Sequence, residues 1–269
     1  MKQRVITAVI ALAIFLPIVF LDFGGQAVNL MAALFAVVGV YELFRMNNLT
    51  ILSFEGILSA IGAVILVLPK NPWFSFLAEG TSKYALFSVI VLLLLGVLVI
   101  SKNTYTIDEA GFPIIVSLYV GIGFESFAVA RSSSIVVLFF GLLVVWATDI
   151  GAYMIGRQYG KRKLWPEISP NKTIEGALGG IVSAVIIAGI YLLVFPVTTY
   201  FGHSYVVMLL LTIVLSIVGQ FGDLVESAIK RHYGVKDSGT ILPGHGGILD
   251  RFDSMIFVFP VMYLVGIFS

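Results

Sequence analysis

Long apolar runs separated by short polar segments dominate this sequence. They cover residues 1–22, 24–44, 51–69, 84–100, 112–130, 134–156, 174–195, 205–229 and 249–268. A helix needs about 20 apolar residues to cross the hydrocarbon core of a bilayer, and each run is near that length. A helix also satisfies its backbone hydrogen bonds internally, as lipid requires. The pattern therefore predicts an all-α, polytopic transmembrane helix bundle of about nine spans.

The composition supports lipid as the solvent for much of the chain. Of the 269 residues, 59% are hydrophobic and only 12% are charged, whereas a soluble domain carries about 25% charged residues. The mean hydropathy is +1.05. A net charge of +1 gives no reason to expect a nucleic-acid partner. The chain has no cysteine, so any metal must be held by oxygen or histidine ligands.

The basic residues predict the orientation of the bundle. Residues 1–22 form a longer apolar run than a typical signal peptide and no small-residue cleavage site follows, so we expect a retained first span. With a cytoplasmic N-terminus, all but three of the 16 lysine and arginine residues lie on the cytoplasmic side; the three are Lys70, Lys83 and Arg131. This bias predicts a cytoplasmic N-terminus. It also places the loops at 156–173 and 230–247 on that side.

The N-terminal half carries few candidates for chemistry. Glu42, Arg45 and Glu55 lie near the ends of predicted spans, where we expect them to snorkel to the interface. Glu125 lies deeper in its span, and we favour a structural ion pair over a functional role there. We see no internal repeat.

Asp149 lies well inside an apolar run. A charged side chain at the bilayer centre costs about 2.5–3.5 kcal/mol even on the lenient insertion scale, so Asp149 needs a partner or a wet cavity. One interpretation is a buried acid hydrogen-bonded to threonine or tyrosine of a neighbouring helix. We favour a metal or substrate ligand, because other acids lie in spans that could face it.

A second polar group follows the basic run at 160–163, which by itself is typical of a topology anchor. The segment from Ser169 to Gly176 is more specific. Asn171 or Thr173 can cap the next helix, with Glu175 in its first turn. Lys172 then lies beside free backbone N–H groups at a helix N-terminus, which favours phosphate binding.

A third group forms a stripe on the helix predicted at about 205–232. Its members recur at three and four residues and share one face: Ser216, Gln220, Asp223, Glu226 or Ser227, and Lys230. Such a stripe must face protein or water. A polar contact between helices, with Lys230 neutralising Glu226, explains the stripe but not the loop that follows.

That loop combines glycines, bases and acids. Backbone N–H groups in glycine-rich turns suit phosphate oxygens when bases lie nearby. Asp250 and Asp253 lie one turn apart at the start of the last helix, and acid ligands favour hard cations such as Mg²⁺. His245 is a candidate phosphate donor or acid/base, although a histidine in a turn is usually a simple hydrogen-bonding residue. Together these features predict metal-assisted phosphate chemistry.

The long motif closely resembles the defining motif of the phosphatidate cytidylyltransferases. It reads Ser227-x2-Lys230-Arg231-x4-Lys236-Asp237-x-Gly239-x2-Leu242-Pro243-x-His245-Gly246-Gly247-x2-Asp250-Arg251-x-Asp253. Asp149 with Gly151, and the segment Ser169 to Gly176, are similar to other recurrent segments of that family. The resemblance covers residues 146–176 and 216–254, and no charged position of the long motif departs from it.

The resemblance implies an integral enzyme of the bacterial inner membrane with its active site facing the cytoplasm. Such an enzyme condenses CTP with phosphatidic acid to give CDP-diacylglycerol and pyrophosphate. It also implies dependence on Mg²⁺, two cation sites with K⁺ as a possible second ion, and a homodimer in the lipid bilayer. We expect residues 1–130 to form the scaffold, dimer and lipid-access spans. Residues 131–269 should form the catalytic region of one integrated membrane domain.

The resemblance and the spacing together give the expected site residues. The principal metal ligands are Asp223 and Asp250, and further direct or water-mediated ligands are Asp149, Asp253 and Glu226. The phosphate contacts are Lys172, Lys230, Arg231, Lys236 and His245, and the wider substrate-binding set adds Asn171, Asp237 and Arg251. The residues expected to carry catalysis are Asp223, Asp250, Lys230, Arg231 and His245. No general base is needed, because the attacking phosphate is already ionised.

Two other functions use similar residues. An ion-coupled secondary transporter would place acids at broken helices near the midplane and would show internal repeats. A CTP-dependent lipid kinase would transfer the γ-phosphate to a lipid alcohol and would need an activating base. The concentration of acids, bases and glycine turns near one surface favours the cytidylyltransferase.

Overall fold

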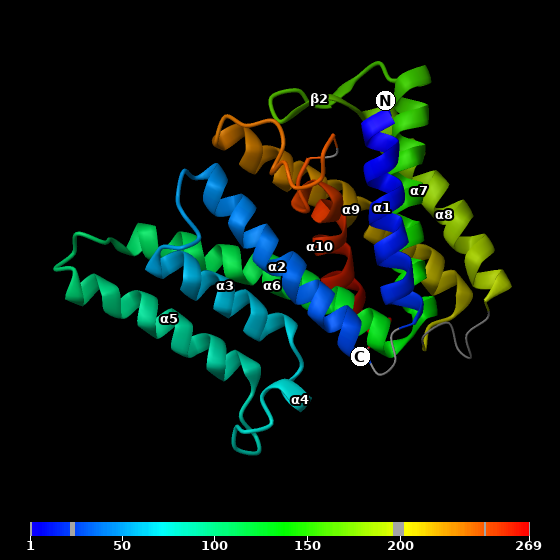
Figure 1. The fold of residues 1–269 in the computed structure, drawn as a ribbon. Helices are drawn as coiled ribbons and strands as arrows, with labels where there is room; N and C mark the ends of the chain where they lie inside the picture. Colours follow the sequence, from blue (N-terminus) through cyan, green and yellow to red (C-terminus); the bar gives the residue numbers. More distant parts are fainter. Residues whose placement is uncertain (1, 22–24, 196–201, 245, 269) are drawn as a thin grey trace. The chain divides into compact units, whose positions relative to one another are not determined.

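The computed structural model describes residues 2–21, 25–195, 202–244 and 246–268 (Figure 1). Its helices are α1 (Lys2–Phe20), α2 (Gln26–Met46), α3 (Phe54–Val67), α4 (Lys70–Trp73), α5 (Lys83–Ile100), α6 (Ile107–Ser133), α7 (Ile135–Tyr159), α8 (Ile174–Val194), α9 (Tyr205–His232) and α10 (Leu249–Leu264). Two short strands, β1 (Lys163–Trp165) and β2 (Ser169–Thr173), pair antiparallel. The predicted all-α class is confirmed, and each predicted apolar run contains a helix.

Within the described residues, six helices are long and apolar enough to cross a membrane: α2, α5, α6, α7, α8 and α9. Val9–Phe20 and α3 are shorter apolar helices, and α10 has 16 residues. The predicted polytopic bundle is therefore confirmed. The number of nine spans and the cytoplasmic N-terminus stay predictions.

Hydroxyl side chains define where several helices begin. The first backbone N–H groups of a helix have no partner within the helix, and a serine or threonine at the N-cap can accept from one of them. Such caps occur at Ser53, Ser82, Ser134, Thr173 and Ser204. These residues end polar gaps of the sequence, so the helix starts agree closely with the predicted runs.

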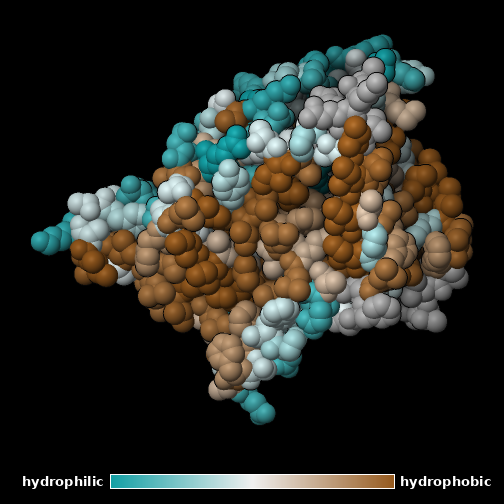
Figure 2. All heavy atoms as spheres, in the orientation of Figure 1, coloured by the Kyte–Doolittle hydropathy of each residue, from teal (hydrophilic) through white to brown (hydrophobic). Residues whose placement is uncertain are grey.

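The chain divides into two compact units. The first unit comprises Met1–Ala128 and Asp237–Leu249. In it, α2 packs against α1 and α3, and α3 packs against α5; Figure 1 shows α3 between α2 and α5. Phe35 and Phe44 of α2 contact rings of α6 at centroid distances of 5.9 and 5.2 Å. In Figure 2, apolar residues cover the helices of this unit and polar residues surround the loops at either end of α5.

For two acids of the first unit, Glu42 and Glu125, we predicted a structural rather than a functional role. Glu125 forms an ion pair with Lys83, which confirms the structural pairing. The prediction that Glu42 snorkels to the interface is wrong: its relative exposure is 0%. Glu42 instead accepts hydrogen bonds from residues of the Asp237–Leu249 segment, because that segment folds against α2 and supplies donors that a position near a span end did not reveal.

The second unit comprises Val129–Lys236 and Asp250–Ser269. Helix α7 packs against α8 and α9, and α8 packs against α9. A Cβ added at Gly176 would lie 2.8 Å from the Ala152 carbonyl oxygen, and one at Gly180 would lie 2.7 Å from the Thr148 carbonyl oxygen. Glycine therefore permits the close approach of α7 and α8, as is common between membrane helices.

The segment between α7 and α8 was predicted as a loop, and the structure forms it into the β1–β2 hairpin. Glu175 accepts hydrogen bonds from the backbone N–H groups of Lys161 and Arg162 at 3.0 and 3.1 Å. These bonds tie the start of the hairpin to the first turn of α8. Figure 1 shows the hairpin at the end of α7.

Candidate active site

The polar stripe of α9 contacts the neighbouring helices of the second unit. Ser216 Oγ lies 2.8 Å from Thr148 Oγ1 of α7, and Gln220 Nε2 donates to the Ala177 carbonyl of α8 at 3.3 Å. Ser216 is 1% exposed. The prediction that the stripe faces protein is confirmed. These contacts orient α9 so that the residues further along the same face meet β2 and α10.

Lys230 joins α9 to α10 through two carboxylates. Its Nζ atom lies 2.7 Å from Glu226 Oε2 and 2.7 Å from Asp250 Oδ1. Glu226 is fully buried, and its other oxygen, Oε1, has no hydrogen-bond partner in the described structure. The expected neutralisation of Glu226 by Lys230 is present, and Asp250 is added to it. In this structure Lys230 therefore holds the carboxylates of Glu226 and Asp250 close to one another.

Lys172 extends from β2 to α9, where its Nζ lies 2.5 Å from Asp223 Oδ2. The next residue, Thr173, caps α8: its hydroxyl accepts from the Gly176 N–H at 3.1 Å. Of the two caps that the sequence allowed, Thr173 is the one observed. Because the cap fixes the end of β2, it also fixes the position from which Lys172 reaches Asp223.

Asp149 and Asp253 complete the network. Asp149 interacts electrostatically with Asp223, Asp253 and Lys172, and Asp253 interacts with Asp223 and both lysines. The close approach of α9 and α10 depends on Gly222, where an added Cβ would lie 2.7 Å from the Asp253 carbonyl oxygen. The fold thus gathers acids from α7, α9 and α10, although they are far apart in the sequence.

A cavity of about 440 Å³ opens beside this network. Asp149, Asp223 and Lys172 line it, together with five polar residues of the second unit: Tyr153, Arg157, Asn171, Thr173 and Gln220. Sequence reasoning did not select Tyr153 or Arg157 as site residues. Both follow Asp149 at helical spacing on α7, four and eight residues later, and that periodicity could have identified them. The cavity therefore combines carboxylates with two cations and two amides.

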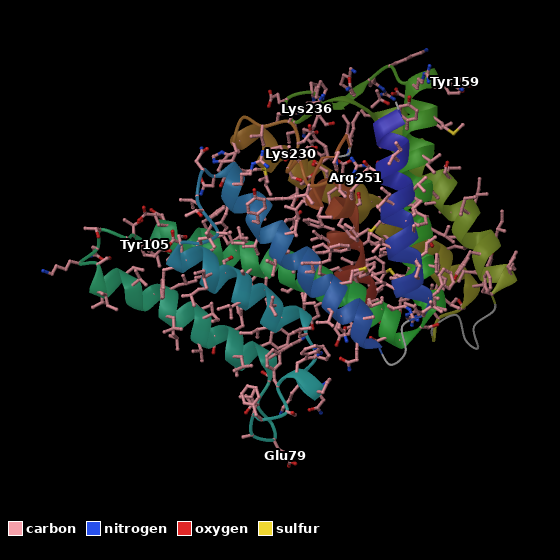
Figure 3. All side chains as sticks on the ribbon, in the orientation of Figure 1. Glu79, Tyr105, Tyr159, Lys230, Lys236 and Arg251 are labelled. Atoms are coloured by element: carbon pink, nitrogen blue, oxygen red, sulfur yellow. The ribbon has the colours of Figure 1, made fainter. Side chains whose placement is uncertain are left out.

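The remaining predicted residues have different surroundings. Arg231 is exposed and donates to the carbonyls of Ile168 and Val235, both at 3.3 Å. Lys236 and Arg251 are exposed in the second unit. Figure 3 shows them toward the same end of that unit as Lys230 and Tyr159.

Asp237 and His245 complete the set of predicted residues. Asp237 is exposed and belongs to the first unit. His245 lies outside the described residues, so its predicted role stays a prediction.

The network has an excess of negative charge. Five carboxylates, those of Asp149, Asp223, Glu226, Asp250 and Asp253, accompany two ammonium groups, which leaves three formal negative charges. Within the described residues, no three acid or histidine side chains form a ready-made metal cluster. Mg²⁺ usually takes one or two carboxylates and completes its shell with water and substrate phosphates. The charge excess and the unpartnered Glu226 Oε1 fit such an ion.

Helices long and apolar enough to cross a membrane, together with a cavity lined by carboxylates, lysine and arginine, define a polytopic membrane protein with a charged cavity. The chain belongs to the cytidylyltransferase family, whose sequence model matches residues 2–268. This confirms the family indicated by the motif.

Similar proteins match along nearly their whole length. The phosphatidate cytidylyltransferase of Bacillus subtilis (strain 168) is 46% identical, over 100% of this chain and 99% of that protein. Those of Staphylococcus haemolyticus (strain JCSC1435) and Staphylococcus aureus (strain COL) are 47% and 43% identical, each over 98% of both chains.

Proposed function

We propose that this protein is an enzyme of phospholipid synthesis that condenses CTP with phosphatidic acid to give CDP-diacylglycerol and pyrophosphate. The observation that carries the proposal is the full-length similarity to proteins named phosphatidate cytidylyltransferase. The apolar bundle suits a substrate that stays in the bilayer, and the charged cavity suits the phosphates of both substrates.

The proposed reaction is an in-line displacement at phosphorus. A phosphate oxygen of phosphatidic acid attacks the α-phosphorus of CTP and forms the new P–O bond. The bond from that phosphorus to the oxygen bridging to the β-phosphate breaks, and its electron pair leaves with pyrophosphate. The attacking phosphate is ionised near neutral pH, so the protein need not remove a proton. Its main task is to hold two mutually repelling polyanions together.

The cations of the second unit are suited to that task. Lys172 and Arg157 line the cavity, and we assign Lys172 to a substrate phosphate. The Lys172–Asp223 ion pair then opens as substrate binds, because the ammonium exchanges one anion for another. Asn171 and Gln220 add amide groups that can orient the ligand. Arg231, Lys236, Arg251, Asp237 and His245 stay proposed substrate contacts.

Lys230 needs a different assignment from the one its sequence position suggested. Two carboxylates hold its ammonium group at 2.7 Å, so we assign it first to keeping Glu226 and Asp250 in place. We assign Asp223 and Asp250 as principal ligands of Mg²⁺, with Asp149, Asp253 and Glu226 as further direct or water-mediated ligands. Bound Mg²⁺ would offset phosphate repulsion and stabilise charge on the departing pyrophosphate. K⁺ is the proposed second cation.

We also propose that the protein is a homodimer of the bacterial inner membrane with a cytoplasmic N-terminus and a site facing the cytoplasm. The distribution of lysine and arginine supports this orientation, and CTP is a cytoplasmic substrate. Cysteine-free protein permits a direct test: single cysteines at Lys102 and at Glu79 should react with a membrane-impermeant reagent from opposite sides. Labelling of both from the same side would contradict the topology.

The reaction is tested on purified protein in detergent with phosphatidic acid, Mg²⁺ and CTP labelled separately at the α- and γ-phosphates. We expect α-label in the lipid fraction and γ-label in pyrophosphate. Lipid labelled only from the γ-position would identify a lipid kinase. An absence of lipid labelling under varied ions would return ion-coupled transport to consideration.

A further inference from the structure

Glu42 of α2 organises the segment that leads into α10. Its side chain is 0% exposed. One carboxylate oxygen, Oε1, accepts from the Ile248 N–H at 2.8 Å. The other, Oε2, accepts from the Leu249 N–H at 2.9 Å and from Ser238 Oγ at 3.0 Å. A single side chain thus binds both ends of the Asp237–Leu249 segment, although about 200 residues of sequence separate it from them.

Two glycines of the same segment leave the space that Glu42 fills. A Cβ added at Gly239 would lie 2.5 Å from Glu42 Oε1, and its next two neighbours would also be Glu42 atoms. A Cβ at Gly247 would lie 2.5 Å from Glu42 Cδ and would also meet Ser238. Any side chain at these positions would displace the carboxylate. The glycines and the acid therefore form one packed arrangement.

This arrangement bears on the site because Leu249 is the first residue of α10. The two backbone N–H groups that Glu42 binds lie at the start of that helix, and Asp250 follows in its first turn. We propose that Glu42 is a positioning residue that fixes the first turn of α10, in which Asp250 directly follows Leu249. The inference rests on the proposed function for the role of Asp250. Groups that orient metal ligands typically change metal affinity or activity by about 10–100-fold.

The first test replaces Glu42 by glutamine in the full-length protein. Glutamine keeps the shape but turns one acceptor oxygen into an NH₂ group that faces N–H donors. In metal-free protein we expect amide hydrogen exchange in peptides covering 246–252 to be about tenfold faster, because hydrogen bonds to Ile248 or Leu249 are lost. In the activity assay, the Mg²⁺ concentration for half-maximal rate should rise about 10–100-fold, with the KM for phosphatidic acid unchanged.

Glu125→Gln is the matched control, because Glu125 is a second acid of the first unit with little exposure, and its ion-pair partner is Lys83 rather than a residue of the Asp237–Leu249 segment. It makes the same chemical change and should leave both readouts at wild-type values. If Glu42→Gln leaves exchange and Mg²⁺ dependence unchanged, the proposal is wrong. It is also wrong if only the amount of folded protein falls. Glu42→Asp, which keeps the charge but is one methylene shorter, should give intermediate values and serves if the glutamine variant does not fold.

A second test uses the packing between Glu42 and Gly239. Gly239→Ala alone should speed exchange at 246–252 and raise the Mg²⁺ requirement, because the added methyl displaces the carboxylate. In a Glu42→Ala background the methyl has room, so the double variant should match Glu42→Ala within about twofold. If the effects of the two substitutions instead multiply in the double variant, the proposal is wrong. Exchange is measured without substrate, so this result is separate from the labelling result: wild-type protein that makes no CDP-lipid would contradict the proposed function alone.

Discussion

The two units differ in the balance between their acidic and basic side chains. In the first unit, Lys83 and Glu125 form an ion pair of one base and one acid, with side chains 16% and 13% exposed. In the second unit, two lysines form ion pairs with three acids. Two further acids, Asp149 and Asp253, interact electrostatically with this group, and Asp149, Asp223 and Lys172 line a cavity. In a matched pair the acid and the base neutralise each other. An excess of charge in an apolar bundle costs free energy unless a ligand of opposite charge neutralises it. The difference separates a structural ion pair from a binding site.

The largest expected difference between the two units follows from removing one carboxylate from each. Asp223→Asn should lower kcat by at least about 10²–10³-fold, the scale for losing one group that stabilises transition-state charge. Glu125→Gln should leave kcat near the wild-type value. Rates of purified, correctly folded proteins test this, with circular dichroism as the check on folding. Near-normal turnover by Asp223→Asn would show that the excess charge does not mark the site.

The next largest difference concerns the two buried lysines. Removing one partner of a buried ion pair costs about 3 kcal/mol or more in unfolding free energy, because a charge is left uncompensated. Lys83→Met and Lys230→Met should therefore both destabilise the protein. Only Lys230→Met should also lower kcat of the folded fraction, since Glu226 and Asp250 lose their common partner. Equal loss of kcat in both variants would contradict the distinction between the two units.

A third prediction tests whether Lys172 exchanges partners during catalysis. Lys172→Ala should raise the KM for a phosphate-bearing substrate by about tenfold, the effect of losing roughly one charge-assisted hydrogen bond. Lys163→Ala, in the exposed part of the same hairpin, is the matched control and should change KM little. Steady-state kinetics with CTP and with phosphatidic acid varied in turn would show which substrate Lys172 contacts. An unchanged KM for both would remove Lys172 from the binding set.

The smallest expected effect concerns the helix caps. Thr173→Ala removes the hydroxyl that caps α8 and should lower unfolding free energy by about 1 kcal/mol. Ser134→Ala removes the equivalent cap of α7 and should cost a similar amount. Because Thr173 follows Lys172, only its loss should also raise KM slightly, by less than the Lys172 substitution. Thr173→Ser keeps the hydroxyl and should restore both values; failure to do so would exclude the cap as the cause.

Periodicity made one part of the site predictable. Ser216, Gln220, Asp223 and Lys230 follow one another at three-to-four-residue spacing or multiples of it on α9, so local geometry alone places them on one face. Asp149 was selected because an acid in a long apolar run is costly. These arguments need only the sequence and the properties of lipid. The structure confirms that the α9 stripe meets protein partners, and it places Asp149 in the lining of the cavity.

Side-chain contacts between elements that are distant in the sequence were harder to predict. The sequence offered Lys172 and Lys230 as phosphate contacts, and the structure holds both against carboxylates. It left the cap of α8 open between two residues and gave no reason to expect a β-hairpin at 163–173. Glu42 was predicted to lie at the interface because it is near a span end, and this was wrong because its donors lie about 200 residues further along the chain.

The sequence by itself determined the membrane class, the apolar helices and the set of charged residues, because hydropathy, helical period and motif are local properties of the chain. The tertiary structure decided which acid faces which lysine, where the cavity opens and what Glu42 binds. Those outcomes depend on the close approach of particular helices at Gly176, Gly180 and Gly222, where a single added carbon would keep the helices apart. The spacing of residues along the chain does not give the distance between two packed helices.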